Sequence, residues 1–106
     1  MTVPLLTWNT RGLSLQKAKH LTTRFPNYIY LLSETHPNIN TLQHFRTLQL
    51  NIIHNQSDTL CTIYPSHLTL LAVTLDTHYA LEVLFNITNH TIFICNIHLS
   101  NTPTQR

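Results

Sequence analysis

The chain contains a single glycine, Gly12, and this scarcity excludes several motifs that depend on glycine. A Walker loop, a dinucleotide-binding fingerprint and a nucleophile elbow each need two or more glycines at fixed spacing. The histidines show no HExxH or zinc-finger spacing, and no Ser-His-Asp order stands out. Glycine-rich nucleotide loops and the common hydrolase triads are therefore not expected.

Charged residues are also scarce, at 9% of the 106 residues, whereas hydrophobic residues make up 42%. Disorder requires low hydrophobicity and high charge, so this composition predicts one globular domain over residues 1–106. The formal charge of +2 gives only a mild attraction to polyanions, which protonation of the histidines would strengthen. Lysines and arginines do cluster near residues 11–24, where a solvated helix face is the simpler explanation.

Cysteines and long apolar runs are few as well. Cys61 and Cys95 have no CxxC spacing, so we expect two buried free thiols rather than a zinc site or a disulfide. No apolar run is long enough to span a bilayer, and the N-terminus lacks a signal-peptide pattern. The sequence thus predicts an intracellular protein of the cytoplasm or nucleus, without a membrane partner.

The hydrophobic pattern predicts strand, helix and strand in the first third of the chain. Residues 3–10 form a short apolar run that ends in a turn signal. Ser14 then precedes apolar residues at helical spacing as far as Phe25, and residues 28–34 return to strand character. A short helix capped by Asn40 or Thr41 is expected next. The remaining expected elements are strands at 50–55, 58–64, 67–76, 79–87 and 91–99, the last two forming a hairpin.

The first two strands place polar side chains together. A strand–helix–strand unit forms a right-handed crossover, which leaves two parallel strands with their carboxyl ends at one edge. Asn9 ends the first strand and Glu34 ends the second. Ligands of open α/β sheets usually bind at this edge. If the two strands are neighbours, an amide and a carboxylate lie side by side at a candidate site.

Each of these residues has a functional and a structural interpretation. Glu34 could hold Mg²⁺, which prefers hard oxygen ligands and often needs only one or two carboxylates, or it could simply reach water. Asn9 could orient Glu34, contact a phosphate oxygen, or form an ordinary Asx turn. Arg11 could contact a phosphate or be a surface residue.

The last apolar run, TIFICNIHL, ends in His98, with Asn96 on the same face by strand alternation. A histidine beside a metal-bound phosphodiester can act as a general acid or stabilise negative charge. The alternative is a strand histidine that is merely hydrogen-bonded, and the chain has seven further histidines.

Three separated stretches resemble one family. TWNTRGL (residues 7–13), LLSETH (31–36) and NIHLSNTP (96–103) are similar, in order and spacing, to strands of the endonuclease/exonuclease/phosphatase superfamily, which is deoxyribonuclease I-like. The pairing of the first two stretches looks most like the endonuclease domain of non-LTR retrotransposons. Ser33 stands where that family usually has glutamine.

This resemblance implies a magnesium-dependent phosphodiesterase that nicks DNA. It places Glu34 at the metal-binding glutamate, and it assigns Asn9 and His98 to catalysis. It further implies that Asn9, Arg11 and Asn96 contact phosphate or nucleic acid. The implied fold is a truncated half of a four-layer α/β sandwich, with one mixed β-sheet and one or two helices on one face.

Departures from the family limit the expected activity. Family members are longer and carry a later Asp-x-Asn motif and a terminal Asp-His pair, which this sequence lacks. We therefore expect a partial domain with an incomplete magnesium ligand set and little or no nuclease activity. DNA is a possible partner, and another protein or a second copy should cover the open sheet face. Two alternatives remain: a non-catalytic interaction module, and an unrelated small α/β domain in which Asn9, Glu34 and His98 lie apart.

Overall fold

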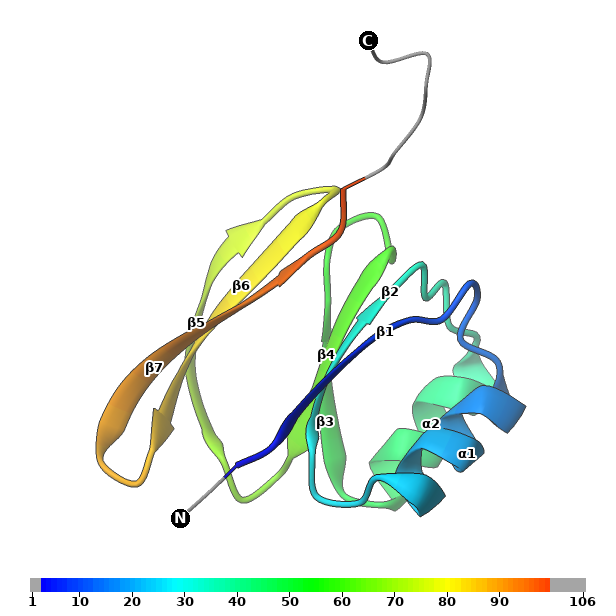
Figure 1. Cartoon of the computed structure of the whole chain (residues 1–106), viewed down its shortest axis with the longest axis horizontal. Helices are drawn as coiled ribbons and strands as arrows, with labels where there is room; N and C mark the ends of the chain where they lie inside the picture. The colour runs from blue at the N-terminus through cyan, green and yellow to red at the C-terminus, as the bar shows by residue number, and fades with distance from the viewer. Residues whose placement is uncertain (1–2, 100–106) are drawn as a thin grey trace, which may run out of the picture.

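The computed structural model describes residues 3–99 and shows an α/β fold (Figure 1). Neither helix in this part of the chain has the length and apolar character needed to cross a membrane. The elements follow one another as β1 (Leu5–Asn9), α1 (Leu15–Arg24), β2 (Ile29–Ser33), α2 (Ile39–Thr47), β3 (Leu50–His54), β4 (Leu60–Pro65), β5 (Thr69–Asp76), β6 (Ala80–Ile87) and β7 (His90–Ile97).

The strands form two sheets. The first sheet is mixed and has the order β1-β2-β4-β3, and the second is antiparallel with the order β5-β6-β7. Helices α1 and α2 cover one face of the first sheet, and the second sheet lies against the other face (Figure 1). The expected half of an α/β sandwich, with its helices on one face, is confirmed. The expectation that all strands join one mixed sheet is corrected by this division.

Burial of the central strands explains why a second sheet is needed. Every residue of β2 and of β4 is buried, so both faces of the first sheet must be covered. Tyr30 and Leu32 pack with the helices, whereas Ile29 and Leu31 pack with side chains of the second sheet. Had β5–β7 continued the first sheet, one of these two faces would have remained open to water.

Helix starts are set by capping side chains. Ser14 caps α1 as predicted, because its Oγ accepts a hydrogen bond of 3.2 Å from the Lys17 amide. The cap of α2 is Asn38, whose Oδ1 accepts from the Thr41 amide at 2.9 Å, so the prediction of Asn40 or Thr41 was wrong. The apolar pattern does not reveal this start, because Ile39, the first residue of the helix, is 70% exposed and does not join the buried stripe.

Two predicted strand pairings are confirmed. β1 and β2 are parallel neighbours, and their register runs from Leu5 opposite Ile29 to Asn9 opposite Ser33. β6 and β7 form a hairpin with Ile87 opposite His90. Its two turn residues both have positive φ angles, as a type I′ hairpin turn requires; they are Thr88 (52°) and Asn89 (63°).

Candidate functional site

The candidate site lies where the loops after β1 and β2 run alongside each other. Backbone hydrogen bonds continue the parallel pairing beyond the two strands. They join Thr10 N to Ser33 O (2.9 Å), Gly12 N to Glu34 O (2.6 Å) and Leu13 N to Thr35 O (2.7 Å). Because both loops are tied together, the backbone of Glu34 has a fixed position beside the β1–α1 loop.

Two side chains that the sequence reasoning missed strengthen this arrangement. Thr10 is buried, and its Oγ1 donates to the Glu34 carbonyl at 3.1 Å or to the neighbouring Ser33 carbonyl at 3.0 Å. Lys17 Nζ donates to the carbonyls of Thr10 (2.6 Å) and Gly12 (3.1 Å). Side chains in the first turn of a helix tilt towards its N-terminus, which brings Lys17 over the preceding loop. That tilt is the signal that could have identified it.

Backbone conformation at the site is unusual for the residues present. Gly12 has φ of +92°, and a Cβ at this position would meet nothing within 4 Å, so glycine is needed for its conformation rather than for space. Glu34 also has a positive φ, of 52°, although it carries a side chain. Such a conformation costs on the order of 1 kcal/mol. The backbone hydrogen bonds between the two loops offset this conformational cost, and the resulting conformation directs the Glu34 carboxylate towards Asn9.

Asn9, Glu34 and His98 meet at one carboxylate oxygen. Asn9 Nδ2 donates a hydrogen bond of 2.5 Å to Glu34 Oε2, and His98 Nε2 lies 3.3 Å from the same oxygen. The side chains of His98 and Glu34 are 33% and 45% exposed, so solvent and ligands can reach them. The structure thus brings together three residues that the sequence carries in three separate motifs.

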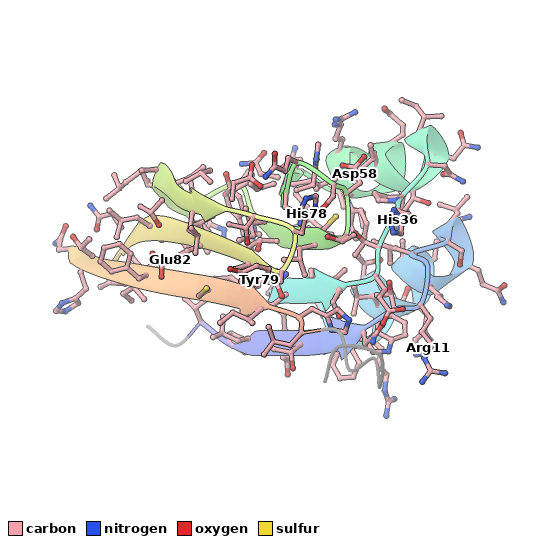
Figure 2. The ribbon with its side chains drawn as sticks, turned by 90° about the horizontal axis from the view of Figure 1, so that it is seen from above. Arg11, His36, Asp58, His78, Tyr79 and Glu82 are labelled. Atoms are coloured by element: carbon pink, nitrogen blue, oxygen red, sulfur yellow. The ribbon has the colours of Figure 1, made fainter. Side chains whose placement is uncertain are left out.

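Asn9 performs two of the roles considered for it. Its Oδ1 accepts a hydrogen bond of 3.2 Å from the Arg11 amide, which is the predicted Asx turn. Its Nδ2 meanwhile orients Glu34. The Arg11 side chain extends outward from the β1–α1 loop (Figure 2), and its guanidinium forms no hydrogen bond or ion pair with residues 3–99. It is therefore close in sequence to the site but outside the cluster.

Asn96 lies between the two sheets and is only 5% exposed. Its Nδ2 donates to the carbonyls of Leu32 (3.0 Å) and Cys61 (3.2 Å), which belong to the two central strands of the first sheet. Both amide hydrogens are used in this way, so donation to a phosphate would require these bonds to break. In the structure Asn96 holds the end of β7 against the first sheet, two residues before His98.

A groove runs along the open side of this cluster. It has a volume of about 360 Å³ and lies between β1, the end of β2 and β7. Polar groups line it at the end nearest the cluster, where Asn9, Ser33 and Asn96 contribute. A phosphate or sugar group could enter this end of the groove.

The cluster offers one carboxylate, that of Glu34, and no dedicated metal cage among the described residues. Residues 3–99 contain no group of three or more His, Cys, Asp or Glu side chains arranged to hold a metal. Both polar contacts of the Glu34 carboxylate fall on Oε2, and no described residue forms a hydrogen bond or ion pair with Oε1. Mg²⁺ keeps several waters and often binds through one or two carboxylates. Glu34 Oε1 can serve as such a ligand.

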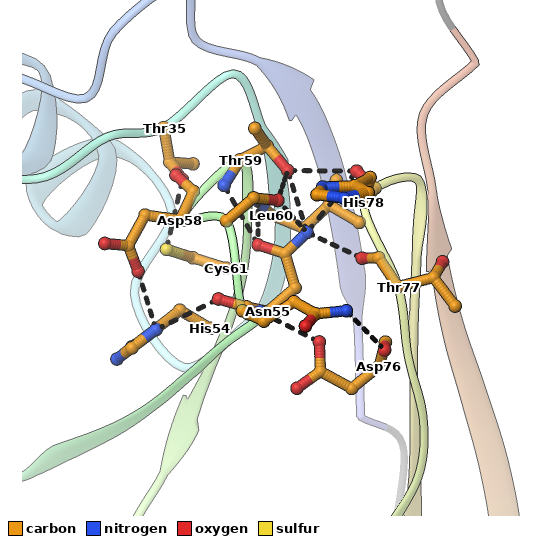
Figure 3. Close-up of polar contacts among 12 residues, drawn as sticks. Thr35, His54, Asn55, Asp58, Thr59, Leu60, Cys61, Asp76, Thr77 and His78 are labelled. Atoms are coloured by element: carbon orange, nitrogen blue, oxygen red, sulfur yellow. Dashed lines mark hydrogen bonds and ion pairs between the residues drawn. The ribbon is translucent and has the colours of Figure 1, made fainter.

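A second polar cluster serves a structural purpose (Figure 3). Asn55 is fully buried, and its Nδ2 donates to Thr59 Oγ1 (2.7 Å) and to the Thr77 carbonyl (2.8 Å). Its Oδ1 accepts from the amides of Thr59 (2.9 Å) and Leu60 (3.0 Å). These bonds join the β3–β4 loop to the β5–β6 turn and leave no group of Asn55 directed at solvent.

The cysteines differ from each other. Cys61 is buried as expected, and burial raises the pKa of its thiol to about 11. Cys95 is only half-buried, which departs from the expectation, because it lies on β7 at the edge of the second sheet. Partial burial and the nearby Glu82 raise its pKa as well. Both thiols are free.

The sequence matches no known protein-family profile, and no curated protein is significantly similar to it. The functional interpretation therefore depends on the motifs and on the geometry of the site. An unrelated domain with coincidental motifs predicts that Asn9, Glu34 and His98 lie apart, and the structure places them in contact.

Proposed function

We propose that Asn9, Glu34 and His98 form the cation-binding and phosphate-binding part of a magnesium-dependent phosphodiesterase site that acts on DNA. The observation that carries this proposal is the convergence of Asn9 and His98 on Glu34 Oε2 from strands far apart in the sequence. The resemblance of the three stretches to endonuclease/exonuclease/phosphatase motifs gives these same residues metal-binding and catalytic roles.

Each residue has a separate role in this proposal. Glu34 would hold the cation through its carboxylate, and Asn9 fixes the orientation of that carboxylate. When bound, Mg²⁺ polarises a phosphoryl oxygen and offsets its negative charge. His98 faces the carboxylate through Nε2, and its imidazole, when protonated, adds positive charge beside the phosphate. Arg11 supplies positive charge near the cluster and can contact a phosphate along the bound strand.

This chain is expected to bind a phosphodiester without efficiently cleaving it. The sequence contains no Asp-x-Asn stretch and no adjacent Asp-His pair, so the groups that activate water in the resembling family are lacking. Loss of a general base typically lowers rates by a factor of about 10² to 10⁴. We therefore expect magnesium-dependent binding of a phosphodiester with little or no cleavage by the 106-residue chain.

The test is the affinity of the chain for a short fluorescent DNA, measured by anisotropy with Mg²⁺ and with a chelator. The proposal predicts tighter binding with Mg²⁺, and predicts that Glu34→Gln removes this difference. Glu82→Gln is the matched control, because Glu82 is a partly exposed carboxylate on the second sheet, where it accepts from Thr74. A DNA affinity that stays the same with the chelator and in the Glu34→Gln variant would overturn the proposal.

A second function has an observation in its favour. Large apolar side chains are exposed on the second sheet and on β1, a pattern that marks interaction surfaces. They include Leu5, Leu71, Val73, Leu75, Phe93 and Ile97. A non-catalytic interaction module predicts association through this surface together with DNA binding that is insensitive to Mg²⁺.

A further inference from the structure

A step lies between the open edges of the two sheets. β1 is an edge strand of the first sheet, β7 is an edge strand of the second, and β7 packs against β2 (Figure 1). β1 consequently projects beyond β7. Leu6 packs with the helices, so Leu5 and Thr7, which alternate with it, face the opposite side. Within the described residues no strand of the second sheet covers them.

The step forms an apolar groove. Its volume is about 410 Å³, and its lining includes Leu5, Leu31, Ile92 and Phe93. It meets the polar groove beside Asn9, and none of the residues that line either groove is charged. Leu5, Phe93 and Ile97 are 51%, 61% and 59% exposed. This surface therefore offers apolar contacts and no charge that would repel an identical surface.

The edge of β7 lacks the features that usually block strand addition. Its eight residues pair with β6 in one continuous register, and it contains no proline, lysine or acidic residue. β5, at the opposite edge of the same sheet, has two register shifts that disrupt its edge. Of the two edges of this sheet, β7 is the one prepared to accept another strand.

A strand added beside β7 would lie directly over β1. The strand of a second copy that fits there is β1. The uncovered face of the second copy's β1 can then pack on the uncovered face of the first copy's β1. β7 of one copy cannot pair with β7 of another. The second copy's β7 would bring its own β2 with it, and that β2 would occupy the space of the first copy's β1. We propose that the chain forms a two-fold dimer in which β1 of each copy pairs with β7 of the other.

The exposed apolar area is somewhat smaller than, but of the same order as, the apolar area that such a dimer buries. With side-chain areas of roughly 150–200 Å², Leu5, Ile92, Phe93 and Ile97 expose on the order of 350 Å² per copy. A standard interface buries about 800 Å² per partner, of which somewhat over half is apolar.

The test is sedimentation equilibrium of the full chain over a concentration series up to about 200 μM. A monomer–dimer equilibrium with micromolar affinity is expected. Leu5→Lys should weaken the dimer at least tenfold, because it places a charge in the apolar groove. Leu71→Lys is the matched control: Leu71 is 50% exposed on β5, away from the step, and its substitution should leave the affinity unchanged.

Thr7→Arg provides a second variant in case Leu5→Lys impairs folding, and it should weaken the dimer in the same way. Circular dichroism is used to check that each variant is folded. Cys95 adds a geometric check: in the proposed dimer the two Cys95 residues lie at least about 14 Å apart, given the usual strand and sheet spacings, so oxidation should yield no disulfide-linked dimer. A monomer at every concentration, equal weakening by Leu71→Lys, or a Cys95 disulfide would overturn the proposal.

Discussion

Asn9 donates a hydrogen bond of 2.5 Å to Glu34, a residue 25 positions later in the chain. This contact follows from the parallel register of β1 and β2, which places Asn9 opposite Ser33 and therefore beside the residue that follows it. His98, the residue after the end of β7, approaches the same carboxylate. The site is thus assembled by strand pairing and by the packing of the second sheet on the first.

The first prediction concerns cleavage. Incubation of supercoiled plasmid with the purified chain and Mg²⁺ should give little or no nicking, because the water-activating groups of the resembling family are lacking in this sequence. Gel electrophoresis measures the relaxed form. Nicking that disappears with Glu34→Ala and with a chelator would show that the chain is catalytically competent and that the expected need for further groups is wrong.

The second prediction concerns Asn96 as a positioning residue. Asn96→Leu removes two hydrogen bonds between the sheets, and we expect it to lower the free energy of unfolding by about 1–3 kcal/mol. It should also change the NMR signals of the His98 imidazole, because His98 follows two residues later. Asn86→Leu is the control: Asn86 is exposed on β6, and its effect should stay within about 0.5 kcal/mol. Unchanged His98 signals would contradict the positioning role.

The third prediction concerns the buried Asn55 network. Asn55→Ala leaves the amides of Thr59 and Leu60 without their side-chain acceptor, and it should destabilise the fold by about 2–4 kcal/mol. Chemical denaturation measures this loss. Asn40→Ala, at an exposed position in α2, should be close to neutral. Equal effects of the two substitutions would mean that the network contributes little.

The fourth prediction concerns pH. Burial, with a smaller contribution from the charge of Lys19, lowers the pKa of His44 below its ordinary value of 6.5. The unfolded chain therefore binds a proton at His44 before the folded chain does, so this residue lowers stability as the pH falls below about 6.5. His44→Gln should reduce the loss of stability between neutral and mildly acidic pH. Identical pH profiles for the two proteins would contradict this assignment.

The sequence could predict the features that depend on local geometry. Alternation and helical spacing identified β1, α1 and β2, and the crossover rule then placed Asn9 near Glu34. Ser14 was recognisable as a cap from its position before the apolar pattern. His98 could be singled out at the end of the last apolar run, but its contact with Glu34 could not be predicted, because nothing in the local pattern shows where β7 packs.

Features that depend on distant contacts could not be predicted in this way. A strand pattern gives the length and faces of a strand but not the sheet that it joins, so the second sheet was missed. The bonds of Lys17 to loop carbonyls and of Asn96 to Leu32 and Cys61 likewise depend on tertiary packing. Polar residues with a functional appearance, such as Asn96, can thus be committed to holding the fold together.

The most direct test of the central claim is amide NMR of the chain titrated with Mn²⁺, a paramagnetic stand-in for Mg²⁺. The proposal predicts selective broadening of the signals from residues near Glu34, including Asn9 and His98. It also predicts that Glu34→Gln abolishes this broadening and that Glu82→Gln leaves it intact. Broadening centred elsewhere, or unchanged by Glu34→Gln, would contradict the claim that Glu34 binds a divalent cation.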